Sequence, residues 1–123
     1  MAITEITPST VSLDTGFVLT TGAGTAINTS NTMEFAYPKQ GHLLITIDSD
    51  HASTSASFTA GYGVAAGLGS LACAVGDTVM QGFVFSSDRL LVATGDGANA
   101  FKGCLQITWA TNSAGFVQAF YLP

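Results

Sequence analysis

The sequence of 123 residues predicts one all-β domain that spans residues 1–123. We expect an antiparallel β-sandwich or a jelly-roll-like barrel of about eight strands that ends in a C-terminal hairpin. Short apolar runs with an alternating pattern recur along the chain, and turn residues separate them. Helix signals are nearly absent, because four glycines interrupt the longest alanine-rich stretch, residues 61–75, and each glycine weakens a helix.

Residues 42–48 form the clearest predicted strand, which is entered through Pro38 and Gly41. Leu43, Ile45 and Ile47 share one face of it, and the opposite face is largely polar. We therefore expect these three side chains to belong to the core.

Two later segments continue the pattern. Residues 79–85 predict a strand that leads into a polar turn. Residues 105–109 alternate, and together with residues 116–122 they predict the terminal hairpin. Because the chain ends directly after a strand, we expect this last strand to lie inside a sheet. Weaker strand signals lie at residues 2–7, 10–20, 32–36, 53–59 and 90–93.

The composition restricts the classes of partner. Hydrophobic residues make up 47% of the chain, whereas charged residues make up only 9%, against about 25% in an ordinary soluble domain. The net charge is −5, and Lys39, Arg89 and Lys102 are the only basic residues. Three scattered cations cannot displace counterions from phosphates, which excludes nucleic acid and anionic membranes as partners. The sequence shows neither a signal peptide nor an apolar run of membrane-spanning length, so we expect synthesis in the cytoplasm.

Cys73 and Cys104 lie among small or apolar neighbours and predict two buried free thiols. A disulfide between them remains an alternative. A zinc site is not expected, because the sequence has no CxxC spacing.

Each motif that could carry chemistry lacks a required partner. Asp14, in Asp-Thr-Gly, matches the tripeptide of aspartic proteases, but Phe17 follows it and the second signature of that class is missing, which favours a turn. Asp48, Asp50 and His51 lack the longer pattern of a calcium loop. Residues 61–67 resemble a dinucleotide loop, but no helix follows. We therefore predict no enzyme, no cofactor and no metal.

Aromatic side chains offer a second class of function. Trp109, Tyr62 and Tyr121 could line the sugar platform of a carbohydrate-binding module. However, Trp109 shares a strand face with Leu105 and Ile107, so the alternation predicts that it is buried in the core.

Short sequence segments, taken in their order along most of the chain, resemble those of a set of small proteins of tailed bacteriophages, the capsid decoration (cement) proteins. The first of these segments is an N-terminus rich in Thr and Ile. The others are residues 24–27 with 31–32, residues 37–45, residues 67–71, residues 86–89 and residues 113–123.

The resemblance implies a virion structural protein. It would be made in the bacterial host cytoplasm and would bind the outer surface of the major capsid protein lattice, stabilising the head as a ligand of the assembled state. Copies of the chain would contact each other, and a homotrimer is the natural symmetry at a three-fold junction. A phage tail or fibre component is an alternative within the same class.

Apolar residues that the strand pattern does not clearly bury are our prediction for the contact surface. They fall in the N-terminal segment and in the glycine-rich loop, and they are Ile3, Ile6, Tyr62, Val64, Leu68 and Leu71.

Overall fold

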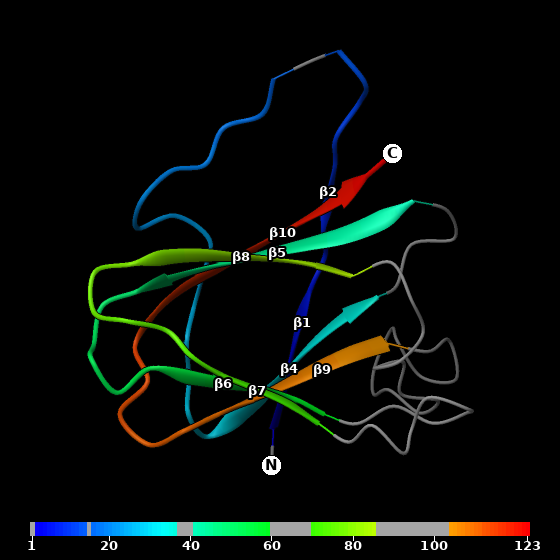
Figure 1. Cartoon of the computed structure of the whole chain (residues 1–123). Helices are drawn as coiled ribbons and strands as arrows, with labels where there is room; N and C mark the ends of the chain where they lie inside the picture. Colours follow the sequence, from blue (N-terminus) through cyan, green and yellow to red (C-terminus); the bar gives the residue numbers. More distant parts are fainter. Residues whose placement is uncertain (1, 15, 37–40, 60–69, 86–103) are drawn as a thin grey trace.

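The chain folds into two packed β-sheets, which confirms the predicted all-β class (Figure 1). The computed structural model describes residues 2–14, 16–36, 41–59, 70–85 and 104–123, and within them there is no helix. The described strands are β1 (Ala2–Ile6), β2 (Ser9–Thr10), β3 (Thr25–Ala26), β4 (Asn31–Ala36), β5 (His42–Ser49), β6 (Ser55–Phe58), β7 (Leu71–Ala74), β8 (Met80–Phe85), β9 (Cys104–Trp109) and β10 (Gly115–Leu122).

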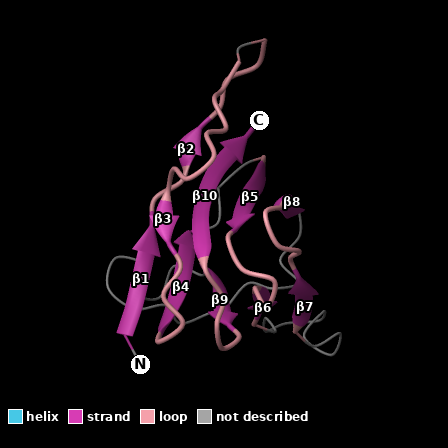
Figure 2. Ribbon diagram, turned by 90° about the vertical axis from the view of Figure 1, so that its left-hand side faces the viewer, coloured by secondary structure: helices cyan, strands magenta, loops and turns pink. Residues whose placement is uncertain are grey.

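Sheet I has the strand order β1-β4-β9-β6-β7, and sheet II has the order β2-β10-β5-β8. The short strand β3 pairs with β10 as well, through Phe116 and Val117, on the same side as β2. Figure 2 shows β2 and β3 on one side of β10, with β7 and β8 at the opposite side of the molecule.

The central pairs of both sheets are antiparallel, but two N-terminal pairs are not. β1 runs parallel to β4, with Ile3 beside Thr32, and β2 runs parallel to β10, with Ser9 beside Phe120. The predicted sandwich was antiparallel throughout, and it is mixed because the N-terminal chain crosses from the edge of sheet I to the edge of sheet II. Parallel neighbours need a long connection, which residues 7–30 supply between β1 and β4.

The core lies between the two sheets. Leu43, Ile45 and Ile47 are 0% exposed, which confirms the alternation predicted for this strand. Phe58 of sheet I packs against the rings of Phe83 and Phe85 of sheet II, with ring centroids 5.1 and 5.0 Å away. Aromatic contacts between the layers therefore hold the β8 end of sheet II against β6.

Tyr121 joins the two layers between β10 and β4. Its hydroxyl donates to the carbonyl oxygen of Ala36, at the end of β4, over 2.8 Å. Its ring packs against the core, and burial raises the pKa of the phenol.

The predicted C-terminal hairpin is wrong. β9 pairs with β4 and β6 in sheet I, whereas β10 pairs with β5 in sheet II, so the turn between them joins the two layers as an arch. Ile107 and Val117 then reach one core from opposite sides. The alternation of apolar and polar residues indicates which face of a strand is buried. A strand shows the same alternation whether its successor pairs with it in a hairpin or lies in the facing sheet. The expectation that the last strand lies inside a sheet is confirmed, because β10 has partners on both sides.

Most of the weaker strand predictions are confirmed, with boundaries shifted by a few residues. Residues 10–20 are the exception, because only Ser9 and Thr10 pair and the chain then leaves the sheet. The predicted strand at residues 90–93 lies outside the described residues.

Candidate interaction surface

A long arm connects β2 to β3 and crosses the outer side of sheet II. The arm is residues 11–24, of which all but residue 15 are described, and Figure 1 shows it standing away from the layer of β10, β5 and β8. The Val11 amide donates to the Tyr121 carbonyl oxygen at 2.9 Å and holds its start. The Gly22 amide donates to Asp48 Oδ2 at 2.7 Å and holds its end.

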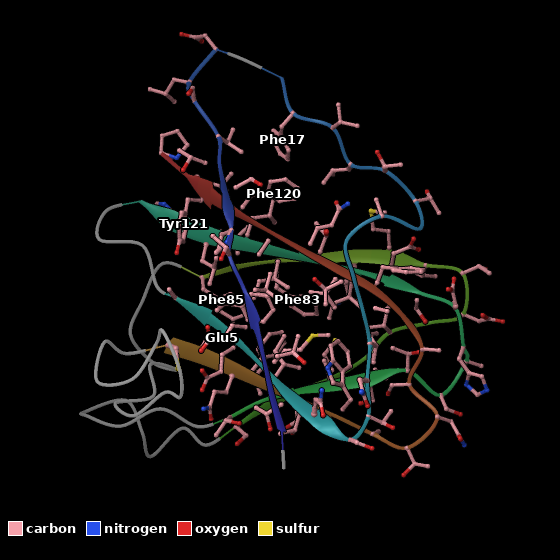
Figure 3. All side chains as sticks on the ribbon, turned by 180° about the vertical axis from the view of Figure 1, so that it is seen from behind. Glu5, Phe17, Phe83, Phe85, Phe120 and Tyr121 are labelled. Carbon is pink, nitrogen blue, oxygen red and sulfur yellow. The ribbon has the colours of Figure 1, made fainter. Side chains whose placement is uncertain are left out.

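An aromatic contact fixes the middle of the arm. Phe17 packs on Phe120, with ring centroids 5.1 Å apart (Figure 3). Phe120 alternates with the core residue Ala119 and therefore points to the outer side of sheet II. It is nevertheless only 8% exposed, because the arm covers it, while Phe17 remains 43% exposed.

The arm carries apolar side chains into solvent. Val18 is 78% exposed and Leu13 is 74% exposed. A second exposed group begins before β8 and continues along its outward face. We define the outer apolar surface as the large exposed apolar side chains among the described residues, which are Leu13, Phe17, Val18, Leu19, Val79, Met80 and Val84.

The β8 part of this surface follows from alternation along the strand. Met80 and Val84 point outward together with Gly82, and a Cβ atom at Gly82 would lie 3.6 Å from the side chain of Leu44 on the neighbouring strand. Single exposed apolar side chains are normal on a protein surface, whereas large contiguous apolar patches are typical of interaction sites.

The arm is incompletely packed against the sheet. A cavity of about 280 Å³ lies among residues of the β1–β2 crossing, the arm, β3 and the middle of β10. Beside it, Gln118 Oε1 is buried and has no hydrogen-bond partner among the described residues. A buried acceptor without a donor costs stability, so the contact between the arm and the middle of β10 leaves one polar group of β10 unsatisfied among the described residues.

A buried polar cluster lies on the outer side of sheet I. Glu34 is 0% exposed, and its Oε2 accepts a hydrogen bond from Gln106 Nε2 at 2.7 Å. Burial raises the pKa of the Cys104 thiol to about 12, and the charge of Glu34 and a hydrogen bond to it contribute as well. The thiol is therefore protonated at neutral pH and is less reactive than an ordinary cysteine, since the thiolate is the reactive form.

Of the residues singled out by motif, Asp14, Asp48, Asp50 and His51 are described, whereas the dinucleotide-loop match at residues 61–67 lies outside the described residues. Asp14 lies exposed in the arm with a φ of 58°, which fits the turn that we expected there. The Asp48 carboxylate accepts a hydrogen bond from the Gly22 amide of the arm. Within the described residues, no three His, Cys, Asp or Glu side chains gather closely enough to hold a metal ion.

The remaining predictions for single side chains have mixed outcomes. Cys73 and Cys104 are both free thiols, but only Cys104 is buried and Cys73 is half-buried. Trp109 is 8% exposed and belongs to the core cluster, as its alternation predicted. Its indole Nε1 has no hydrogen-bond partner among the described residues.

The predicted contact residues and the outer apolar surface do not coincide. Ile6 and Leu71 are partly buried against the core. The side chain of Ile3 in β1 is not described, and Tyr62, Val64 and Leu68 lie outside the described residues. The predicted contact surface does not include the arm, because an apolar run such as Phe17-Val18-Leu19 also fits the pattern of a strand.

No protein-family model, curated protein or solved structure matches this chain. Among the described residues, none forms a helix long and apolar enough to cross a membrane.

Proposed function

We propose that this protein is a virion structural protein, a capsid decoration protein that binds the outer surface of the major capsid protein lattice and stabilises the phage head. The observation that carries the proposal is the outer apolar surface, the large apolar side chains that are exposed on the arm and at β8. The choice of partner is based on the resemblance of the short sequence segments to those of phage decoration proteins.

The physical chemistry of the surface suits adhesion to another protein. Burying an exposed valine or leucine contributes about 1.5–3 kcal/mol, and neutral side chains carry no ionic desolvation cost. A protein that binds only the assembled shell stabilises it by mass action, and the symmetry of the shell repeats each contact many times.

The carbohydrate-binding alternative loses Trp109 from its platform, because this side chain is buried in the core. Tyr121 is partly buried, and Tyr62 lies outside the described residues. A phage tail or fibre component would use the same kind of apolar contact. It differs only in the particle to which the protein binds.

The test is co-sedimentation of the purified protein with purified phage heads. The native chain is expected to saturate heads at a fixed copy number. Val18→Asp places a charge on a side chain that is 78% exposed. It should leave folding intact and weaken binding by about tenfold or more, since about 1.4 kcal/mol corresponds to tenfold in affinity.

Ala72→Asp is the matched control, because Ala72 is exposed on β7 of the opposite sheet. It introduces the same charge and is expected to leave binding unchanged. Equal loss of binding in both variants, or no binding of the native chain to heads, would contradict the proposal. Binding to tails and not to heads would favour the tail alternative.

A further inference from the structure

The free edge of sheet II lies at β8, which has β5 on one side and no described strand on the other. The Ser49 amide donates to the Val79 carbonyl oxygen at 2.9 Å, so the backbone groups of Val79 point toward β5. Backbone groups alternate in direction along a strand. Those of Met80, Gly82 and Val84 therefore point away from β5, to the free edge.

The described residues of β8 carry none of the charged, proline or bulge devices that keep sheet edges apart. Natural edge strands are commonly protected by lysine or other charged side chains, by proline or by bulges. β8 reads Met-Gln-Gly-Phe-Val-Phe, without a charge or a proline, and its six residues pair with β5 in continuous register. The neighbouring edge of sheet I, β7, reads Leu-Ala-Cys-Ala and is equally uncharged.

The edge is complementary to itself. In an antiparallel pair centred on Gly82, Met80 of one copy lies opposite Val84 of the other, and Gly82 lies opposite Gly82. All three residues direct their backbone groups to this edge, so each such pair is of the hydrogen-bonded type, which exchanges two N–H···O bonds. No charged side chain meets its own copy across the axis. The outward side chains of Met80 and Val84, 37% and 57% exposed, would form one apolar strip over both copies.

We propose that two copies of this chain associate through β8, in antiparallel pairing about a two-fold axis at Gly82, so that sheet II continues from one copy into the next. A two-fold axis is the commonest symmetry of soluble homo-oligomers, and it requires a self-complementary patch of this kind. This contact does not depend on binding to a capsid.

The test combines mass in solution with amide exchange. Light scattering on the full chain is expected to show a concentration-dependent dimer. In the dimer, the amides of Met80, Gly82 and Val84 should exchange slowly. On dilution to the monomer they should exchange faster, by about tenfold or more for a loss of about 1.4 kcal/mol in protection, while the amides of Gln81 and Phe83 stay slow in both states.

Gly82→Pro removes the central edge donor and leaves the hydrogen bonds to β5 intact, since proline is tolerated where its nitrogen faces away from the ladder. It should shift the mass to that of the monomer without loss of β-structure by circular dichroism. Val84→Lys, a milder change, should do the same. Val18→Lys is the matched control, because it adds the same charge to an exposed valine of the arm.

A native chain that stays monomeric at high concentration would overturn the proposal. So would an oligomer, trimeric or otherwise, whose mass is unchanged in both β8 variants. An oligomer broken by Val18→Lys and not by Gly82→Pro would place the contact on the arm and would equally contradict it.

Discussion

Glu34 shows how a single strand residue can depart from a simple inside-outside pattern. It alternates with Met33 and Phe35, which belong to the core, and so lies on the outer side of sheet I. It is nevertheless fully buried, with Gln106 and Cys104 among its partners. A buried carboxylate is tolerated only when donors surround it, and both named partners can donate.

The same cluster predicts a loss of stability at alkaline pH. An unfolded cysteine ionises near its ordinary pKa of 9.0, whereas the folded Cys104 thiol ionises only at about 12. Its contribution is therefore complete below pH 9 and is lost as the pH rises toward 12. The loss is on the order of 2–4 kcal/mol, since each pKa unit corresponds to about 1.4 kcal/mol. Tyr121, with its pKa raised by burial, acts in the same direction.

Denaturant unfolding at a series of pH values measures this effect. Cys104→Ala is expected to be less stable at neutral pH but to lose less stability between pH 9 and 12 than the native chain. Cys73→Ala, which removes the half-buried thiol of β7, should retain the native pH dependence. Parallel curves for all three proteins would show that the Cys104 thiol does not carry the effect.

At the scale of elements, the arm illustrates how local sequence and global pairing can disagree. Residues 10–20 contain enough β-branched and apolar residues to predict a strand, yet none of the described residues from 11 to 20 is part of a strand. β2 and β3 pair with the same side of β10. After β2 ends, the neighbour of β10 on this side is β3, which pairs with Phe116 and Val117. A high β-propensity means that a residue fits well on a pleated sheet. It does not ensure that a neighbouring strand is free to pair with that residue.

The hold on the arm predicts a local opening that can be measured. Asp48→Ala removes the acceptor of the Gly22 amide, a hydrogen bond to a charged group that is worth about 1.5–3 kcal/mol. The arm should then be cleaved at least about tenfold faster by a protease that cuts after Phe17 or Leu19, because about 1.4 kcal/mol changes an equilibrium tenfold.

Asp50→Ala is the control for this experiment, because Asp50 is exposed and lies two residues further along the chain. It should be cleaved at the native rate. If Asp48→Ala were cleaved no faster than Asp50→Ala, the Gly22 contact would not be what holds the arm.

The arch between β9 and β10 is the other element whose geometry depends on tertiary contacts. Gly115 begins β10 with a φ of 140°, and a Cβ atom there would collide with the Asp48 carbonyl oxygen. Only glycine combines this backbone conformation with so close an approach of two strands. The glycine is visible in the sequence, but the strand that approaches it is not.

At the scale of the whole molecule, the proposed self-association depends on the net charge and on the exposed apolar side chains. Each copy carries a net charge of −5, so copies repel each other, while β7 and β8 provide no ion pair to oppose this. Screening of the repulsion should therefore strengthen self-association.

Raising the salt from about 0.1 M to about 1 M shortens the Debye length from roughly 10 Å to roughly 3 Å. We expect the dissociation constant of the dimer to fall several-fold over this range when it is measured by analytical ultracentrifugation. Sulfate should strengthen association further, because it favours apolar burial. An association that weakens with salt would show that ion pairs hold the copies together.

The sequence by itself determined the all-β class, the core faces of the central strands and the burial of Trp109. Each of these depends on the period of two along a strand, which is a local property of the chain. Tertiary structure alone decided that β9 and β10 lie in facing sheets, that the N-terminal strands pair in parallel and that the arm displays Val18 and Leu19 to solvent. These features depend on which distant segments pair with each side of a strand. The apolar and polar alternation of a strand is the same whichever neighbour it has, so the sequence alone does not reveal the pairing.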